Sequence, residues 1–363
     1  MIDWNSAETL TLLNPRMPVD ESNKIRQQLS EFSLKGHIWL TTSGTTGRYK
    51  CVALSKEAML ASADAVNHHF ELTKDDRWLH CLPDFHVGGL GIYARAFLSG
   101  AEIVKIDSWD PSHFYLTAVA CSATITAMVP AQLYDIVHLN KQAPESYRFT
   151  IIGGGVISKQ MFVRSWELGW NAVPSYGMTE CASQVATALP GSYDCYQPLR
   201  HVDLRIGPDQ KIIIKSASLL TGYAFPGDEN AEWQDPKVEG WFEAEDKGAF
   251  EQGILQVFGR GSDTIKINGE LVNVMQLQLK IEDLRSQMNL NCPLFIIPVP
   301  HDRSGYALTL AVEGKASEIG KLIDGYNASV LPFERISDVK TVKKIPFSPL
   351  GKVKVDELFH LIN

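Results

Sequence analysis

Residues 41–50 read Thr41-Thr42-Ser43-Gly44-Thr45-Thr46-Gly47-Arg48-Tyr49-Lys50, a run of hydroxyl-bearing side chains with two glycines and a lysine. Glycine tolerates positive φ and lets backbone N–H groups approach a ligand closely. Hydroxyl and ammonium groups add further donors, and together these groups suit a polyphosphate. A surface turn rich in Ser, Thr and Gly remains an alternative on composition alone. The GxxxxGK[ST] phosphate loop is excluded, because Cys51 and Val52 follow Lys50.

The bulk composition is that of an ordinary water-soluble protein. Its 363 residues, 45% of them hydrophobic and 21% charged, allow about two domains with sizeable cores. The formal net charge of −8, without a long basic run, argues against a nucleic-acid partner. The six cysteines are scattered without a CxxC pair, which indicates a reducing compartment and argues against a zinc ribbon. Neither a signal peptide nor a long apolar span is present, so we expect a cytoplasmic protein without a membrane span.

Hydrophobic patterning predicts alternating strands and helices over the first half of the chain. The predicted strands are residues 38–40, 78–82, 103–106, 123–129 and 149–152, and the predicted helices are residues 20–32, a segment from Ser55, a segment ending near 98, 111–119 and 158–168. This alternation indicates a largely parallel α/β sheet with ligand loops at the strand ends. From Val202 onward, hairpins at 202–215 and 250–258 indicate antiparallel strands. We predict two domains, residues 1–258 and a compact α+β unit of residues 259–363.

The segment Ser175-Tyr176-Gly177-Met178-Thr179-Glu180 carries recognisable chemistry. Tyr176 offers a flat face to a purine, Thr179 a hydroxyl to an α-phosphate, and Glu180 a hard oxygen to Mg²⁺. Two other features are weaker. The triplet Gly153-Gly154-Gly155 can be a simple strand-to-helix turn. A histidine beside an aromatic residue, such as His86 after Phe85, is more often packed than catalytic.

Six segments taken together resemble the adenylate-forming superfamily, the acyl-CoA synthetases and their relatives. In the family's order they are residues 41–50, 82–90, 175–180, 240–248, 259–266 and 344–353. Four departures are small: Tyr49 replaces a usual Pro, Cys51 a usual Gly, Ala244-Glu245 a usual Thr-Gly, and Ser348 a usual Thr. One departure is large: the section before the hydroxyl-rich loop (residues 41–50) is shorter than in relatives, so we expect a trimmed first N-terminal subdomain.

The resemblance implies a large N-terminal domain of mostly parallel sheets flanked by helices, with a small β-barrel-like part. It also implies a small, mobile α+β C-terminal domain that rotates about Ser262 and Asp263. The implied ligands are ATP, Mg²⁺ and CoA as co-substrate. The implied nucleotide-binding residues are Thr42, Ser43, Gly44, Thr45, Thr46, Gly47, Lys50, Gly153, Gly154, Gly155, Ser175, Tyr176, Gly177, Asp246 and Arg260. In the same way, Lys352, Thr179, Glu180 and His86 are implied to act in catalysis, with Glu180 as the metal ligand.

The residues after Glu180 resemble most closely the o-succinylbenzoate–CoA ligases of menaquinone biosynthesis. On that basis His86, Ser183, Gln184 and Thr187 are expected to contact the acyl substrate. The implied activity is AMP-forming ligation of 2-succinylbenzoate to CoA. Another aryl- or acyl-CoA ligase, or a non-catalytic nucleotide-binding regulator on the same fold, remain alternatives. The expected partners are small molecules, and whether the chain forms homo-oligomers stays open.

Overall fold

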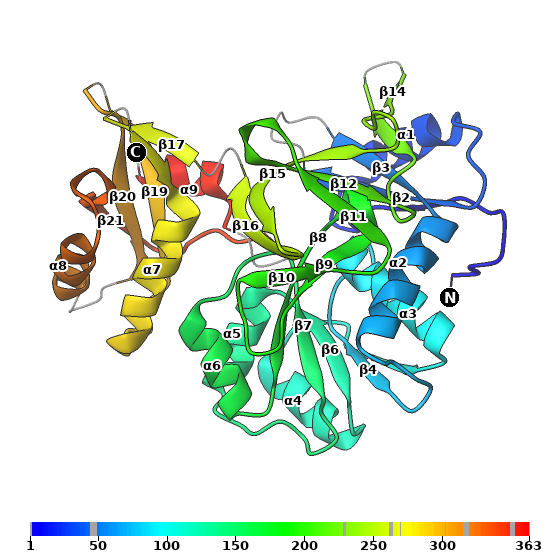
Figure 1. Ribbon diagram of the computed structural model, residues 1–363, viewed down its shortest axis with the longest axis horizontal. Helices are drawn as coiled ribbons and strands as arrows, with labels where there is room; N and C mark the ends of the chain where they lie inside the picture. The colour runs from blue at the N-terminus through cyan, green and yellow to red at the C-terminus, as the bar shows by residue number, and fades with distance from the viewer. Residues whose placement is uncertain are drawn as a thin grey trace.

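The protein is described here from a computed structural model. The structure describes residues 2–43, 49–227, 230–260, 264–268, 270–301, 303–314, 319–348 and 353–362. Its largest element is a mixed sheet of 11 strands, accompanied by a five-stranded sheet and two smaller sheets (Figure 1). Over the described ranges, every helix is too short or too polar to cross a lipid bilayer.

One half of the large sheet is parallel, with its strands in the order β5-β4-β6-β7-β8. These strands are β4 (Arg77–His80), β5 (Glu102–Lys105), β6 (Ile125–Met128), β7 (Phe149–Ile152) and β8 (Ala172–Met178). Neighbouring residues face different cores. Trp78 packs against α2 (Lys56–His69) and α3 (Val87–Ser99), whereas Leu79 packs in a second core on the opposite face of the sheet. Burial on both faces explains why these strands read as short, continuous apolar runs.

The three helices on the second face are α4 (Pro111–Ala120), α5 (Pro130–His138) and α6 (Lys159–Glu167). The capping signals in the sequence mark several helix starts correctly. Ser55 Oγ accepts a hydrogen bond from Ala58 N at 3.0 Å, and Ser158 Oγ accepts one from Met161 N at 3.2 Å. Helix α5 was not predicted, although Pro130 occupies its first turn, a position where proline is favoured.

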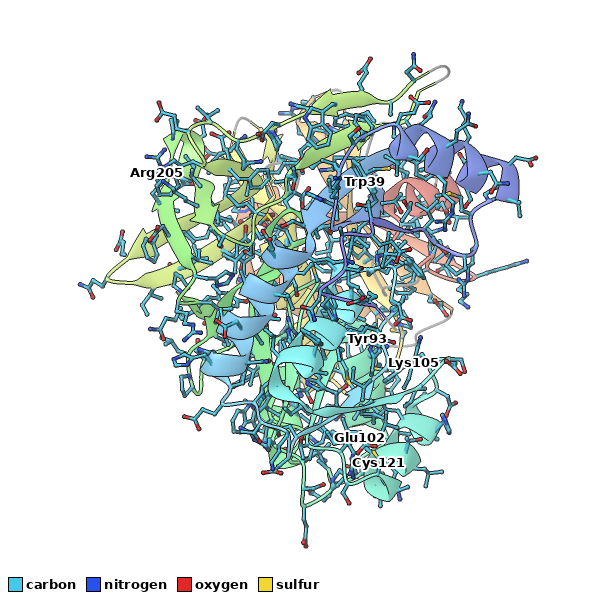
Figure 2. The ribbon with its side chains drawn as sticks, turned by 90° about the vertical axis from the view of Figure 1, so that its right-hand side faces the viewer. Trp39, Tyr93, Glu102, Lys105, Cys121 and Arg205 are labelled. Atoms are coloured by element: carbon cyan, nitrogen blue, oxygen red, sulfur yellow. The ribbon has the colours of Figure 1, made fainter. Side chains whose placement is uncertain are left out.

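The hydroxyl-rich loop belongs to the five-stranded sheet. Its strands are β1 (Leu10–Leu12), β2 (His37–Ser43), β3 (Tyr49–Ser55), β13 (Gly222–Phe225) and β14 (Glu232–Gln234), flanked by α1 (Val19–Ser30). Strands β2 and β3 are antiparallel, so the loop joins the two arms of a hairpin. Strand β3 was not predicted. Its residues 51–54 are all buried: Val52 and Leu54 lie in one core, and the two residues that alternate with them lie in another. Trp39 of β2, labelled in Figure 2, lies against Phe32 with ring centroids 5.7 Å apart.

The other half of the large sheet is antiparallel. It contains β9 (Ser183–Ala188), β10 (Cys195–Pro198), β11 (Val202–Ile206), β12 (Lys211–Ser216), β15 (Phe242–Glu251) and β16 (Ile254–Arg260), with short 3₁₀ turns η1 (Thr179–Cys181) and η2 (Pro208–Gln210). Both predicted hairpins are confirmed, because β11 pairs antiparallel with β12 and β15 with β16. The sheet is therefore parallel only in part, since the strands beyond β8 all pair antiparallel.

The C-terminal residues form a separate core beside β16 (Figure 1, yellow to red). Its elements are β17 (Thr264–Ile267), β18 (Glu270–Asn273), α7 (Val274–Gln287), β19 (Leu294–His301), β20 (Gly305–Glu313), α8 (Ile319–Ser329), η4 (Pro332–Glu334), β21 (Ile336–Val342) and α9 (Val355–Ile362). Strand β16 continues to Arg260, and the domain division at residue 259 remains a prediction.

Candidate active site

The hydroxyl-rich loop is described only at its two ends. Thr42 and Ser43 close β2, in register with Lys50 and Tyr49 of β3. Gly44, Thr45, Thr46 and Gly47 lie outside the described residues, so the predicted phosphate contacts of this loop are not tested. Lys50 is described, and the contacts of its ammonium group lead to the rest of the site.

Lys50 meets Glu180, the residue predicted to hold a metal. Lys50 Nζ donates to Glu180 Oε1 at 2.9 Å, and the two side chains are 26% and 12% exposed. Tyr223 completes this group: its hydroxyl donates to the same Oε1 at 3.0 Å, and Lys50 Nζ lies 4.6 Å from the centre of its ring. Lys50 and Glu180 belong to different motifs, separated by 130 residues of sequence, and the fold brings them into one ion pair.

Tyr223 is a site residue that sequence reasoning missed. A tyrosine in an apolar segment such as Gly222–Phe225 looks like a core residue, and Tyr223 is indeed 7% exposed. What places Tyr223 in the site is the strand pairing: it stands opposite Val52 in the antiparallel pairing of β13 with β3. Lys50 lies two residues from Val52 and thus on the same face of the sheet, diagonal to Tyr223.

Tyr176 lies in strand β8, and Thr179 and Glu180 lie in the turn η1 that follows it. Tyr176 is 8% exposed, and its hydroxyl donates to Asp246 Oδ2 at 3.0 Å. Asp246 stands opposite Arg260 in the β15–β16 ladder, so these two predicted nucleotide-binding positions are cross-strand neighbours. Tyr176 thus meets a hairpin that lies 70 residues further along the chain and carries both Asp246 and Arg260.

The glycine triplet lies at the carboxyl end of β7, next to the end of β8. Gly153 N donates to Met128 O at 3.1 Å, and Ser175 Oγ donates to Ile152 O at 2.9 Å. Gly154 has a φ of +77°, which favours glycine. Carboxyl ends of parallel strands are where α/β sheets bind ligands, and the three glycines predicted to bind the nucleotide occupy that edge.

His86 is the N-cap residue of α3, and its segment is held by Asp84. Asp84 Oδ1 lies 2.8 Å from His80 Nε2 and accepts a hydrogen bond from Tyr93 at 3.2 Å, while Lys105 binds Asp84 Oδ2. Figure 2 shows Tyr93 and Lys105 next to one another. Partial burial by itself raises the pKa of Asp84. Hydrogen bonds from His80 and Lys105 outweigh that effect and lower the pKa to about 2. The carboxylate stays charged and fixes the entry to α3.

Arg95, nine residues into the same helix, is a second residue that sequence reasoning missed. It is 2% exposed, and its terminal nitrogen donates to Ser183 Oγ at 3.1 Å. Its Nε has no hydrogen-bond partner, and no carboxylate of the described residues pairs with it. Burial lowers the pKa of Arg95 to about 10, which still leaves it charged near neutral pH. A buried, uncompensated charge of this kind is costly unless a ligand completes it.

Gln184 and Thr187, two further predicted acyl-site residues, are bonded to one another. Both are buried, and Gln184 Nε2 donates to Thr187 Oγ1. They share a face because a bulge at Val185 shifts the alternation of β9 against β8. Gly177 permits this bulge: a Cβ there would lie 2.0 Å from Ser183 O. The structure joins Ser183 to Arg95 and pairs Gln184 with Thr187, while the role of all three in acyl binding stays a prediction.

Lys352, Ser262 and Asp263 lie outside the described residues. In the part of the chain that is described, no three His, Cys, Asp or Glu side chains gather as a self-sufficient metal site. Mg²⁺ is usually held by one or two carboxylates together with substrate phosphates. Glu180, beside the cationic Lys50, fits that arrangement.

Comparison with known proteins identifies the family. The family described as AMP-binding enzyme matches residues 37–223. The 2-succinylbenzoate–CoA ligases of Bacillus cytotoxicus and Bacillus anthracis are 32% and 31% identical over 267 residues, which cover 68% of this chain and 55% of each relative. The chain thus spans about half the length of the curated relatives that it matches.

Solved structures share the fold. The Bacillus subtilis o-succinylbenzoate CoA synthetase, in complex with the acyl-adenylate intermediate OSB-AMP, superposes with a TM-score of 0.78 at 22% identity, over 96% of this chain and 78% of that one. The amide bond synthetase McbA from Marinactinospora thermotolerans gives 0.75 at 20% identity, over 90% and 70% of the two chains. The predicted α/β fold is confirmed by this likeness. Since the family match extends over more than half of its residues, the chain belongs to the AMP-binding enzymes.

Proposed function

We propose that this chain is an ATP-dependent, AMP-forming acid–thiol ligase that activates 2-succinylbenzoate and transfers it to CoA, a step of menaquinone biosynthesis. The single observation that carries the choice of acid is Arg95, a buried guanidinium joined to Ser183. Ser183 follows Glu180 by three residues, so this charge lies close to the predicted metal ligand. The names of the curated relatives support the same acid.

The residues of the site fit a two-step reaction. A substrate carboxylate oxygen attacks the α-phosphorus of ATP, the bond to pyrophosphate breaks, and an acyl-adenylate forms. The CoA thiolate then attacks the acyl carbon, and AMP leaves. Lys50 neutralises phosphate charge, Asp246 holds the ribose, and Lys352 stabilises charge during the first step. Bound Mg²⁺ would supply charge neutralisation at the phosphates, with Glu180 as its protein ligand.

Arg95 favours an acid with two carboxylates. One carboxylate of 2-succinylbenzoate is consumed by activation, and the other remains an anion able to pair with a guanidinium. A monocarboxylic acid leaves the buried charge without a partner, and sites built for a polar group reject ligands that lack it. Arginine also suits this task because its planar fork matches carboxylate geometry.

The test is a panel of acids assayed for pyrophosphate release and for CoA thioester formation. We expect 2-succinylbenzoate to exceed benzoate and octanoate in kcat/KM. It should also exceed 4-oxo-4-phenylbutanoate, which lacks only the ring carboxylate, by about 100-fold or more. A higher kcat/KM with a monocarboxylic acid would overturn the substrate but leave the ligase. Binding of ATP without pyrophosphate release for any acid would favour the non-catalytic regulator.

A further inference from the structure

Tyr223 contacts both predicted phosphate-site charges at once. Its hydroxyl donates to Glu180 Oε1 at 3.0 Å, and the face of its ring lies 4.6 Å from Lys50 Nζ. Lys50 and Tyr223 both use Oε1, so no described residue donates a hydrogen bond to Oε2 of Glu180. A phenolic hydroxyl is a hydrogen-bond donor near neutral pH, and here its acceptor is the Glu180 carboxylate.

The surrounding fold fixes Tyr223 tightly. Strand β13 is paired on one side with β3, which carries Lys50, and Leu220 N donates to Glu180 O at 2.8 Å. On its other side β13 pairs with β14, and Gly222 lets the Trp233 ring of β14 pack closely, since a Cβ there would lie 2.3 Å from that ring. The tyrosine ring belongs to the main hydrophobic core. A rigid side chain therefore connects the strand that carries Lys50 with the turn that carries Glu180.

We propose that Tyr223 is a positioning residue: its hydroxyl orients the Glu180 carboxylate toward a bound cation, and its ring supports Lys50 for a phosphate. The inference rests on the proposed function in assigning ATP to this site. In the ligand-free protein, Lys50 and Glu180 neutralise one another. If a phosphate drew Lys50 away, the Tyr223 hydroxyl would still hold Oε1, and Oε2 would remain available to a cation. The two contacts are chemically separable, because one needs the hydroxyl and the other only the ring.

The experiment uses the full chain and two variants. Tyr223→Phe removes the hydroxyl and keeps the ring, while Tyr223→Leu removes both. The matched control is Tyr147→Phe, which also removes a buried hydroxyl, here bonded to Thr150 Oγ1 at 2.8 Å in a different core. The probe is ATP, whose binding is measured by calorimetry with chelator and then across a titration of Mg²⁺. Thermal unfolding verifies that each variant is folded.

For Tyr223→Phe we expect the half-saturating Mg²⁺ concentration to rise about 10-fold, as a lost hydrogen bond to a charged group implies. Its metal-free ATP binding should stay within about twofold of the parent. Tyr223→Leu should show the same Mg²⁺ shift and also weaken metal-free ATP binding roughly threefold, through loss of the cation–π contact. In turnover assays, Tyr223→Phe should lower kcat and leave the KM for the acid unchanged. Tyr147→Phe should match the parent in every binding measurement.

Unchanged or tighter Mg²⁺ dependence in Tyr223→Phe would overturn the inference, because the hydroxyl would then be neutral toward the cation or compete with it. The Mg²⁺ dependence of ATP binding is measured without any carboxylic acid, so this result does not depend on the identity of the acyl substrate. If the Mg²⁺ shift is seen but no acid yields a thioester, Tyr223 keeps its role and the ligase proposal fails. If the parent does not bind ATP, both fail. Should Tyr223→Leu not fold, Tyr223→Phe alone still decides the role of the hydroxyl.

Discussion

Arg95 is buried and Lys50 is partly buried, and the surroundings of their two positive charges differ. Lys50 is paired with Glu180, so the charge is compensated before any ligand arrives. Arg95 donates to the neutral hydroxyl of Ser183, and its guanidinium carbon lies over the Trp78 ring, 5.9 Å from the ring centroid. A ligand anion must displace an existing partner at Lys50, whereas at Arg95 it completes an unfilled pair.

This contrast gives a prediction for Arg95→Gln. The substitution keeps hydrogen-bonding capacity and removes the charge, so KM for 2-succinylbenzoate should rise about 10-fold or more while KM for ATP changes little. The measurement is steady-state kinetics with each substrate varied in turn. Arg200→Gln is the control, because Arg200 forms an exposed ion pair with Asp64. Equal effects of Arg95→Gln on both KM values would contradict a role in acyl recognition.

At this scale the sequence is informative where a residue sits in a motif. Lys50 and Glu180 could be singled out because each stands in an ordered pattern of neighbours, and the structure places their side chains in one ion pair. Tyr223 and Arg95 could not, because each resembles a core or surface residue of its own helix or strand. Their importance depends on partners 43 and 88 residues away along the chain. Local patterns contain no information about such contacts.

At the scale of elements, the bulge between β8 and β9 controls the geometry after Glu180. The residues of η1 lead into Ala182 and Ser183, whose φ values of +49° and +102° lie in the left-handed region. Gly177 stands opposite this strained turn and allows Ser183 O to come close. The bulge thereby directs Ser183 toward Arg95 and turns Gln184 toward Thr187.

Gly177→Ala should therefore be strongly destabilising. Its Cβ would lie 2.0 Å from Ser183 O, a backbone atom that cannot move without disturbing the ladder. We expect a loss of about 2–3 kcal/mol in the free energy of unfolding, measured in urea, together with loss of activity. Gly325→Ala is the matched control: this helical glycine in α8 has open space at its Cβ, and the change should stabilise by about 0.5–1 kcal/mol. Similar stability losses in both variants would refute this account of the bulge.

The elements themselves were predictable to different degrees. Helix α2 could be placed because Ser55 is a local cap with a local partner. Strand β3 could not, since the two cores that bury its alternate residues come from distant segments. The bulge is likewise invisible in sequence, because it is a property of the register between two strands.

At the scale of the whole molecule, two contacts between described residues join the C-terminal elements to the N-terminal ones. Arg285 of α7 lies over the Tyr134 ring of α5 at 5.4 Å, and Asn273 Nδ2 donates to Phe258 O at 2.5 Å. Arg285 is also held within its own unit by Glu282 at 2.7 Å. Contacts of this kind can break and reform, which is what the predicted rotation about Ser262 and Asp263 requires. The order of motifs predicted two units, and their boundary remains a proposal.

The rotation gives the sharpest prediction, carried by Lys352. If the C-terminal unit turns between the two steps, Lys352 serves adenylation and is absent from thioester formation. Lys352→Ala should then slow pyrophosphate release about 100-fold or more, as expected for the loss of one charge-stabilising group. The same variant, supplied with pre-made acyl-adenylate and CoA, should form thioester at close to the parent rate. Lys344→Ala, an exposed lysine of the same segment, should leave both steps unchanged. Equal losses in both half-reactions of Lys352→Ala would exclude a lysine that departs between the steps, and with it the proposed rotation.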